Sequence, residues 1–91
     1  MEKIIRQRIM FYGRVQGIGF RYRLKYAASA RGLTGWVKNR YDGSVEAEVQ
    51  GKREEISSLV AAMEDIRFIR LDKVVRTDIP MEEKEYNFHI K

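Results

Sequence analysis

Three glycines and two arginines occur within nine residues, in the run Gly13-Arg14-Val15-Gln16-Gly17-Ile18-Gly19-Phe20-Arg21. Glycine tolerates positive φ angles and lets the backbone approach a ligand closely. The run ends where a helical pattern of apolar residues begins, and the first turn of a helix offers unpaired N–H groups and a partial positive charge to a phosphate. We therefore predict a phosphate-binding loop whose backbone ligands are Gln16, Gly17, Ile18, Gly19 and Phe20.

Arg21 is the side chain that would complete this site. Its guanidinium is planar, permanently charged and able to hold two phosphate oxygens at once. A cation at the start of a helix opposes the helix dipole, and this favours an anion between the two. We predict that Arg21 binds phosphate; the alternative is a solvated surface arginine.

The rest of the sequence offers few other groups for chemistry. There is no cysteine, which excludes a thiolate nucleophile, disulfides and a Cys-ligated metal. No residues occur at metal-ligand spacing, so we expect no metal and no cofactor. The single histidine, His89, alternates with Phe88 and Ile90 and is interpreted as an exposed strand residue.

The elements that position the loop follow from the apolar patterns. Alternation predicts strands at residues 7–13, 34–41, 45–50 and 71–79, with a short last strand at Tyr86, Phe88 and Ile90. Helical spacing predicts a helix at residues 20–31, capped by Gly32, and a second one marked by Ile56, Leu59, Val60 and Met63. Asp42-Gly43 predicts a hairpin turn, and residues 81–85 a solvated loop. The order βαββαβ predicts an α+β ferredoxin-like sandwich: an antiparallel sheet with both helices on one face, and an extra short C-terminal strand.

Composition limits the class of protein. With 91 residues, 44% hydrophobic and 34% charged, we expect a single globular domain over residues 1–91. No apolar run approaches the roughly 20 residues of a membrane span, and there is no signal-peptide pattern, so we expect a cytoplasmic protein. The net charge of +5 favours an anionic partner, either a phosphorylated metabolite or a nucleic acid. We expect no nucleic acid, because the third strand carries Glu46 and Glu48 and no aromatic residue.

Two further motifs follow the glycine-rich run: Gly32-Leu33-Thr34-Gly35-Trp36-Val37-Lys38-Asn39 and Asp42-Gly43-Ser44-Val45-Glu46. In this order the three motifs resemble the acylphosphatase family, small enzymes that hydrolyse acyl phosphates. The resemblance covers residues 13–51; beyond it the chain supports the fold and says little about chemistry. It implies a monomeric hydrolase whose substrate is a small acyl phosphate, with inorganic phosphate or sulfate as a ligand.

The resemblance also assigns roles to two residues. Arg21, with the loop, would bind the phosphoryl group, and Asn39 would orient the attacking water. Without the resemblance, Asn39 is a turn-preferring residue at a strand end, and its amide cannot act as a base at neutral pH. Two alternatives stay open: a phosphate-binding relative without hydrolytic activity, and a nucleic-acid-binding module of the same fold.

Overall fold

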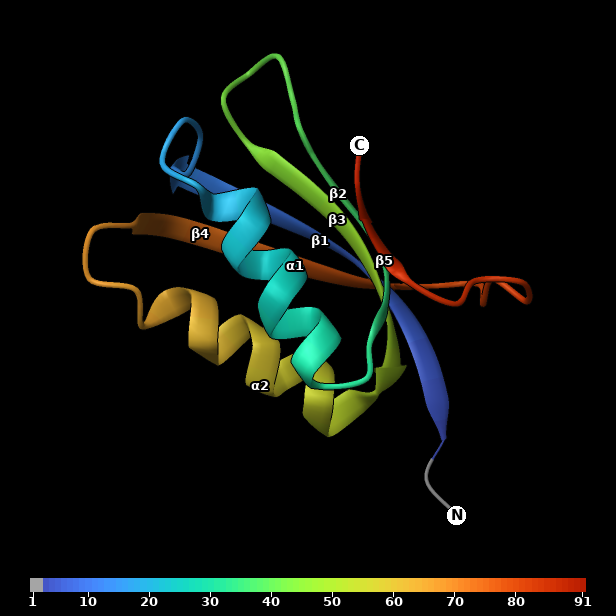
Figure 1. Ribbon diagram of the computed structural model, residues 1–91. Helices are drawn as coiled ribbons and strands as arrows, with labels where there is room; N and C mark the ends of the chain where they lie inside the picture. Colours follow the sequence, from blue (N-terminus) through green and yellow to red (C-terminus); the bar gives the residue numbers. More distant parts are fainter. Residues whose placement is uncertain (1–2) are drawn as a thin grey trace.

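The computed structural model describes residues 3–91. Both helices cover one face of a five-stranded sheet, whose strand order is β4-β1-β3-β2-β5 (Figure 1). The predicted α+β ferredoxin-like fold is confirmed. The elements are, in chain order, β1 (Ile4–Arg14), α1 (Phe20–Ala30), β2 (Thr34–Asn39), β3 (Val45–Lys52), α2 (Arg53–Glu64), β4 (Arg70–Ile79) and β5 (Phe88–Ile90).

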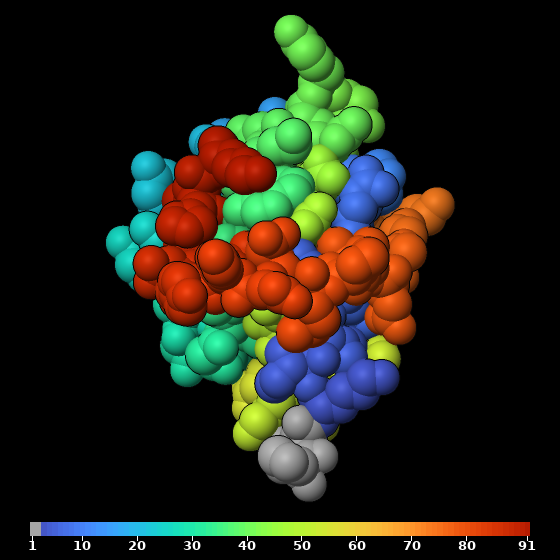
Figure 2. Space-filling model, turned by 90° about the vertical axis from the view of Figure 1, so that its right-hand side faces the viewer, coloured from blue at the N-terminus to red at the C-terminus, as the bar shows by residue number. Residues whose placement is uncertain are grey.

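The sheet is antiparallel except at one edge. β1 pairs with β3 and β4, and β2 with β3, all antiparallel, whereas β5 runs parallel to β2. The reason is the path of the chain, because β4 and β5 lie at opposite edges of the sheet. Residues 80–87, which we call the crossing segment, carry the chain from one edge to the other; Figure 2 shows them in orange to red across the surface.

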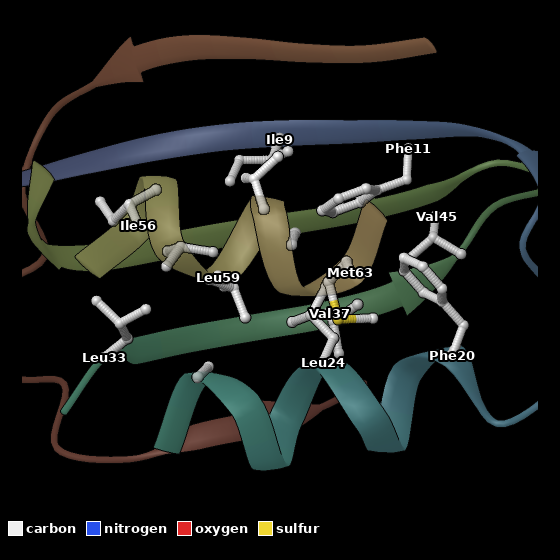
Figure 3. Close-up of a cluster of buried hydrophobic side chains, with 14 of the residues drawn as sticks. Ile9, Phe11, Phe20, Leu24, Leu33, Val37, Val45, Ile56, Leu59 and Met63 are labelled. Carbon is white, nitrogen blue, oxygen red and sulfur yellow. The ribbon is translucent and has the colours of Figure 1, made fainter. Parts of the chain in front are cut away.

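Apolar side chains fill the space between the sheet and the helices (Figure 3). Alternation along β1 points Ile9 and Phe11 inwards, where both are fully buried. The ring of Phe20, the first residue of α1, meets the Phe11 ring edge-on at 5.2 Å between centroids. This contact holds the start of α1 against β1.

Strand ends differ from the predicted bounds because pairing partners lie far away in the sequence. β1 begins at Ile4, since residues 4–6 pair with the end of β3, and it continues past a bulge at Tyr12/Gly13. β2 ends at Asn39 instead of continuing to residue 41. Residues 40–44, the hairpin turn, are closed by a hydrogen bond from the Arg40 N–H to the Ser44 carbonyl at 2.9 Å.

The face of the sheet away from the helices carries a network of charges. Arg6 is buried there, with its guanidinium 3.0 Å from the Glu48 carboxylate and 2.7 Å from that of Glu85. Gln50 exchanges two hydrogen bonds with the main chain of Glu82, at 2.9 and 2.8 Å. The crossing segment, where a solvated loop was predicted, is therefore attached to the sheet at two points.

Neither helix within residues 3–91 is long and apolar enough to cross a membrane.

Candidate active site

The loop between β1 and α1, residues 15–19, has the backbone geometry that the sequence predicts. Gly17 and Gly19 have φ angles of 75° and 77°, in the left-handed region that favours glycine. Gly19 is the N-cap residue of α1, and no side chain caps the helix there. The first turn also contains no acidic side chain. Within the described chain, the first N–H groups of α1 are thus left for an external acceptor.

The glycine loop (residues 15–19) is held by apolar side chains on either side of its glycines. Val15 and Phe20 are buried, and Ile18 packs against the core. A Cβ at Gly17 or Gly19 would meet nothing within 4 Å. Glycine at these two positions is therefore favoured by the backbone conformation and not by crowding.

Arg21 is half-buried in the first turn of α1. Its guanidinium forms no hydrogen bond or ion pair with any residue that the structure describes. Other arginines differ: Arg23 lies 4.6 Å over the ring of Phe68. Ion pairs with carboxylates are made by Arg6, Arg8, Arg40, Arg53 and Arg70. Arg21 thus keeps its charge uncompensated beside the start of a helix, where an anion is favoured.

Asn39 is the last residue of β2. It alternates with the buried Val37, so it is on the face of the sheet that the helices cover. Its side chain is exposed, and no described residue forms a hydrogen bond with it. Figure 1 places the hairpin between β2 and β3 at the same end of the sheet as the glycine loop.

The side chain of Gln16, in the glycine loop, connects this loop to the hairpin turn. The Gln16 amide nitrogen donates to the carbonyl of Arg40 and to that of Ser44, both at 2.8 Å. The residue after Asn39 is therefore bonded directly to the glycine loop.

Two surface hollows border the contact between Gln16 and the hairpin turn. One, of about 410 Å³, is lined by Gly13, Arg14, Val15, Gln16, Gly43, Arg70 and Asp72; the other, of about 430 Å³, is lined by Lys38, Asn39, Arg40, Tyr41 and Asp42.

The carboxylates near the hairpin are already engaged. Glu46 is buried and accepts hydrogen bonds from Arg8 at 2.7 Å and Arg40 at 2.6 Å. Burial alone would raise the pKa of Glu46, but these bonds and charges outweigh it and lower that pKa. Hydrogen bonds from the Ser44 hydroxyl and N–H likewise lower the pKa of Asp42. A carboxylate with a lowered pKa is a poor proton acceptor at neutral pH.

The structure brings together most of the predicted site. The glycine loop and Arg21 lie at the start of α1, and Asn39 lies on the strand end that Gln16 joins to the loop. Gln16 was predicted only as a backbone ligand, and sequence reasoning missed its side-chain bonds. No signal could have identified their acceptors, which lie 24 and 28 residues further along the chain. Among residues 3–91, no three His, Cys, Asp or Glu side chains gather in a way that could hold a metal ion.

The chain is a small α+β protein in which a glycine-rich loop leads into a helix without a side-chain cap, and known proteins identify the family. The family model described as Acylphosphatase matches residues 7–90. An acylphosphatase of Clostridium beijerinckii is 37% identical over 89 residues, which cover 97% of this chain and 99% of that protein. The crystal structure of acylphosphatase from Bacillus subtilis superposes with a TM-score of 0.88 at 37% identity, covering 98% of this chain and 99% of that one. The chain belongs to the acylphosphatase family.

A shorter alignment has a higher identity. An acylphosphatase of Rhodopseudomonas palustris is 52% identical over 61 residues, or 67% of this chain. That alignment spans 61% of the Rhodopseudomonas protein, less than two thirds of its length.

Proposed function

We propose that this protein is an acylphosphatase that hydrolyses the carboxyl-phosphate anhydride bond of a small acyl phosphate, without a metal or cofactor. Membership of the acylphosphatase family supports the reaction. The observation that carries the location of the site is the uncapped start of α1 beside the unpaired Arg21. These are the groups that a phosphoryl group requires.

The chemistry of the substrate explains why so few side chains are needed. The leaving group is a carboxylate, and because free carboxyl groups have pKa values near about 4, it departs without a strong general acid. Water attacks phosphorus, the bond from phosphorus to the acyl oxygen breaks, and its electron pair leaves on the carboxylate. The proton of the water passes to a phosphate oxygen of the substrate. This assignment is supported by the lowered pKa values of Glu46 and Asp42, the carboxyl groups near the hairpin.

Each site residue has a distinct role in this proposal. The N–H groups of residues 16–20 and the guanidinium of Arg21 hold the phosphoryl oxygens and stabilise the charge that they carry in the transition state. The side-chain oxygen of Asn39 accepts a hydrogen bond from the attacking water and holds it in line with the bond that breaks. Positioning and electrostatic stabilisation then account for catalysis.

The proposal also covers the domain organisation, oligomeric state, compartment and ligand class of the enzyme. Residues 1–91 form one acylphosphatase-like domain that acts as a monomer in the cytoplasm, in keeping with a sequence that has no cysteine. A nucleic acid is a poorer partner than a small acyl phosphate, because β3 carries Glu46 and Glu48 and no aromatic side chain on which a base could stack.

A hydrolysis assay with benzoyl phosphate in the presence of EDTA tests this function. The wild-type protein should remain active, and Arg21→Ala should lose at least about 100-fold in kcat/KM, as expected for removal of a charge-stabilising group. The matched control is Arg53→Ala, which removes an arginine from the start of the other helix and should retain activity. A folded wild-type protein without activity would contradict the proposal and favour a phosphate-binding relative.

A further inference from the structure

We propose that Gln16 is a positioning residue for this reaction, and this inference rests on the proposed function. Its side chain fixes the glycine loop, which would hold the phosphoryl group, relative to the strand end that carries Asn39. It does so through two hydrogen bonds to the hairpin turn, each 2.8 Å long. Gln16 itself touches the reacting groups only through its backbone N–H, and its side chain acts through Asn39.

The two hydrogen bonds leave the Gln16 amide little freedom. One NH₂ group has two hydrogens, and it donates to two carbonyls at the mouth of the turn. These carbonyls are themselves held, since the Arg40 carbonyl accepts from the Gly43 N–H at 3.2 Å and the Ser44 carbonyl from the Arg40 N–H at 2.9 Å. The amide is therefore bonded to a closed turn and not to a free loop.

The sheet provides no equivalent connection at this end. Pairing between β1 and β3 stops at Phe11 and Val45, and beyond this point β1 pairs only with β4, through residues 12–14. Among the described residues, no other side chain of the glycine loop forms a hydrogen bond with the hairpin turn. The Gln16 side chain therefore connects the glycine loop to the hairpin turn, beyond the point where pairing between β1 and β3 ends.

The hydrogen bonds of Gln16 set the distance between the bound phosphoryl group and the water held by Asn39, and the rate of the reaction is sensitive to this distance. In-line attack requires the water to lie about 3–3.5 Å from phosphorus, and a misplacement of about 1 Å can cost about 100-fold in rate. Phosphate affinity depends instead on the loop N–H groups and on Arg21, which move together at the start of α1. Loss of the link should therefore lower kcat much more than it weakens phosphate binding.

The test compares Gln16→Met with Gln50→Met. Methionine has a similar length and no donor. Gln50 is the control because it also makes two hydrogen bonds to main-chain atoms, those of Glu82, on the face of the sheet away from the helices; its side-chain oxygen accepts a further bond from Arg6 at 3.2 Å. The measurements are kcat with benzoyl phosphate, the inhibition constant of inorganic phosphate, and the free energy of unfolding. We expect Gln16→Met to lower kcat about 10- to 100-fold with an inhibition constant within about threefold of wild type.

The control should lose at least as much stability, because it also removes an acceptor of the buried Arg6, and it should keep its kcat. A kcat for Gln16→Met within about twofold of wild type would overturn the inference, as would equal losses of kcat in the two variants or a matching loss of phosphate affinity. Hydrogen exchange gives a readout independent of activity, because the Gly43 amide should exchange faster in Gln16→Met. Unchanged exchange there rejects the link even if the enzyme is active, whereas inactive wild-type protein rejects the proposed function itself.

Discussion

At the scale of single residues, Asn39 should separate catalysis from binding. Asn39→Ala removes the group proposed to orient water and leaves the loop and Arg21 in place. We expect kcat to fall about 100-fold or more, with the inhibition constant of inorganic phosphate within about threefold of wild type. Asn87→Ala, at another exposed asparagine, is the control and should behave as wild type. Equal losses in kcat and phosphate affinity would make Asn39 a binding residue.

Two glycines with nearly the same backbone angles allow a second comparison. Gly19 and Gly32 flank α1 with φ angles of 77° and 69°, and neither has an atom within 4 Å of an added Cβ. Alanine at either position should cost about 1 kcal/mol of stability, because L-residues are strained in this region. Only Gly19→Ala should also weaken phosphate binding, as measured by inhibition of benzoyl phosphate hydrolysis. A similar weakening in Gly32→Ala would show that strain in α1 acts from a distance.

The sequence predicted some of these residues better than others. The left-handed backbone of Gly17 and Gly19 and the place of Arg21 in the first turn of a helix could be predicted, because glycine content and helical spacing have a direct physical meaning. The side-chain role of Gln16 could not, since its acceptors are main-chain carbonyls of a distant turn. A carbonyl is present at every residue and gives no signal in a sequence.

At the scale of elements, the crossing segment should make the fold sensitive to acid. Burial alone would raise the pKa of Glu85, but hydrogen bonds from Arg6 and Thr34 outweigh this and hold the pKa below its ordinary value. A carboxyl group whose pKa is lower in the folded state stabilises the fold above its unfolded pKa, and this contribution is lost as the pH falls through the folded pKa. The stabilisation is thus present at pH 7 and disappears below about pH 4.5.

The corresponding prediction concerns Glu85→Gln. At pH 7 this variant should be less stable by about 1–3 kcal/mol, because it weakens a charge-assisted pair with the buried Arg6. The difference should be smaller at pH 3 than at pH 7, because the stabilisation by the Glu85 charge is lost progressively once the pH falls below the unfolded pKa. Urea unfolding at both pH values measures it, with the exposed Glu83→Gln as the control. A difference independent of pH would contradict the role of the charge.

Elements were predicted more accurately in type than in extent. Alternation in β3 and helical spacing in α2 identify both elements, since each has one buried face. The missed segments are those stabilised by distant partners. The start of β1 was missed because it pairs with the end of β3. The strand β5 was predicted, but its parallel pairing with β2 depends on the path of the crossing segment. Local patterns do not contain this information.

At the scale of the whole molecule, the proposed site and the charge network lie apart. The glycine loop and the hairpin turn share one end of the sheet (Figure 1). Arg6, Glu48 and Glu85 lie on the face away from the helices, beneath the crossing segment. Substitutions in this network should therefore change stability and leave kcat unaltered, whereas those at the junction of loop and hairpin change kcat.

A titration with inorganic phosphate, followed through the backbone amide signals in NMR spectra, tests directly whether the glycine loop and Arg21 bind phosphate. We predict that the largest shifts occur at residues 16–21 and that Arg21→Ala weakens the binding at least about tenfold, as loss of a bidentate charged ligand should. If the largest shifts occur instead at the hollow on the face of the sheet away from the helices, lined in part by Trp36, Tyr86 and Lys91, the glycine loop is not the phosphate site. Binding by Arg21→Ala that equals that of wild type would likewise contradict the role of Arg21.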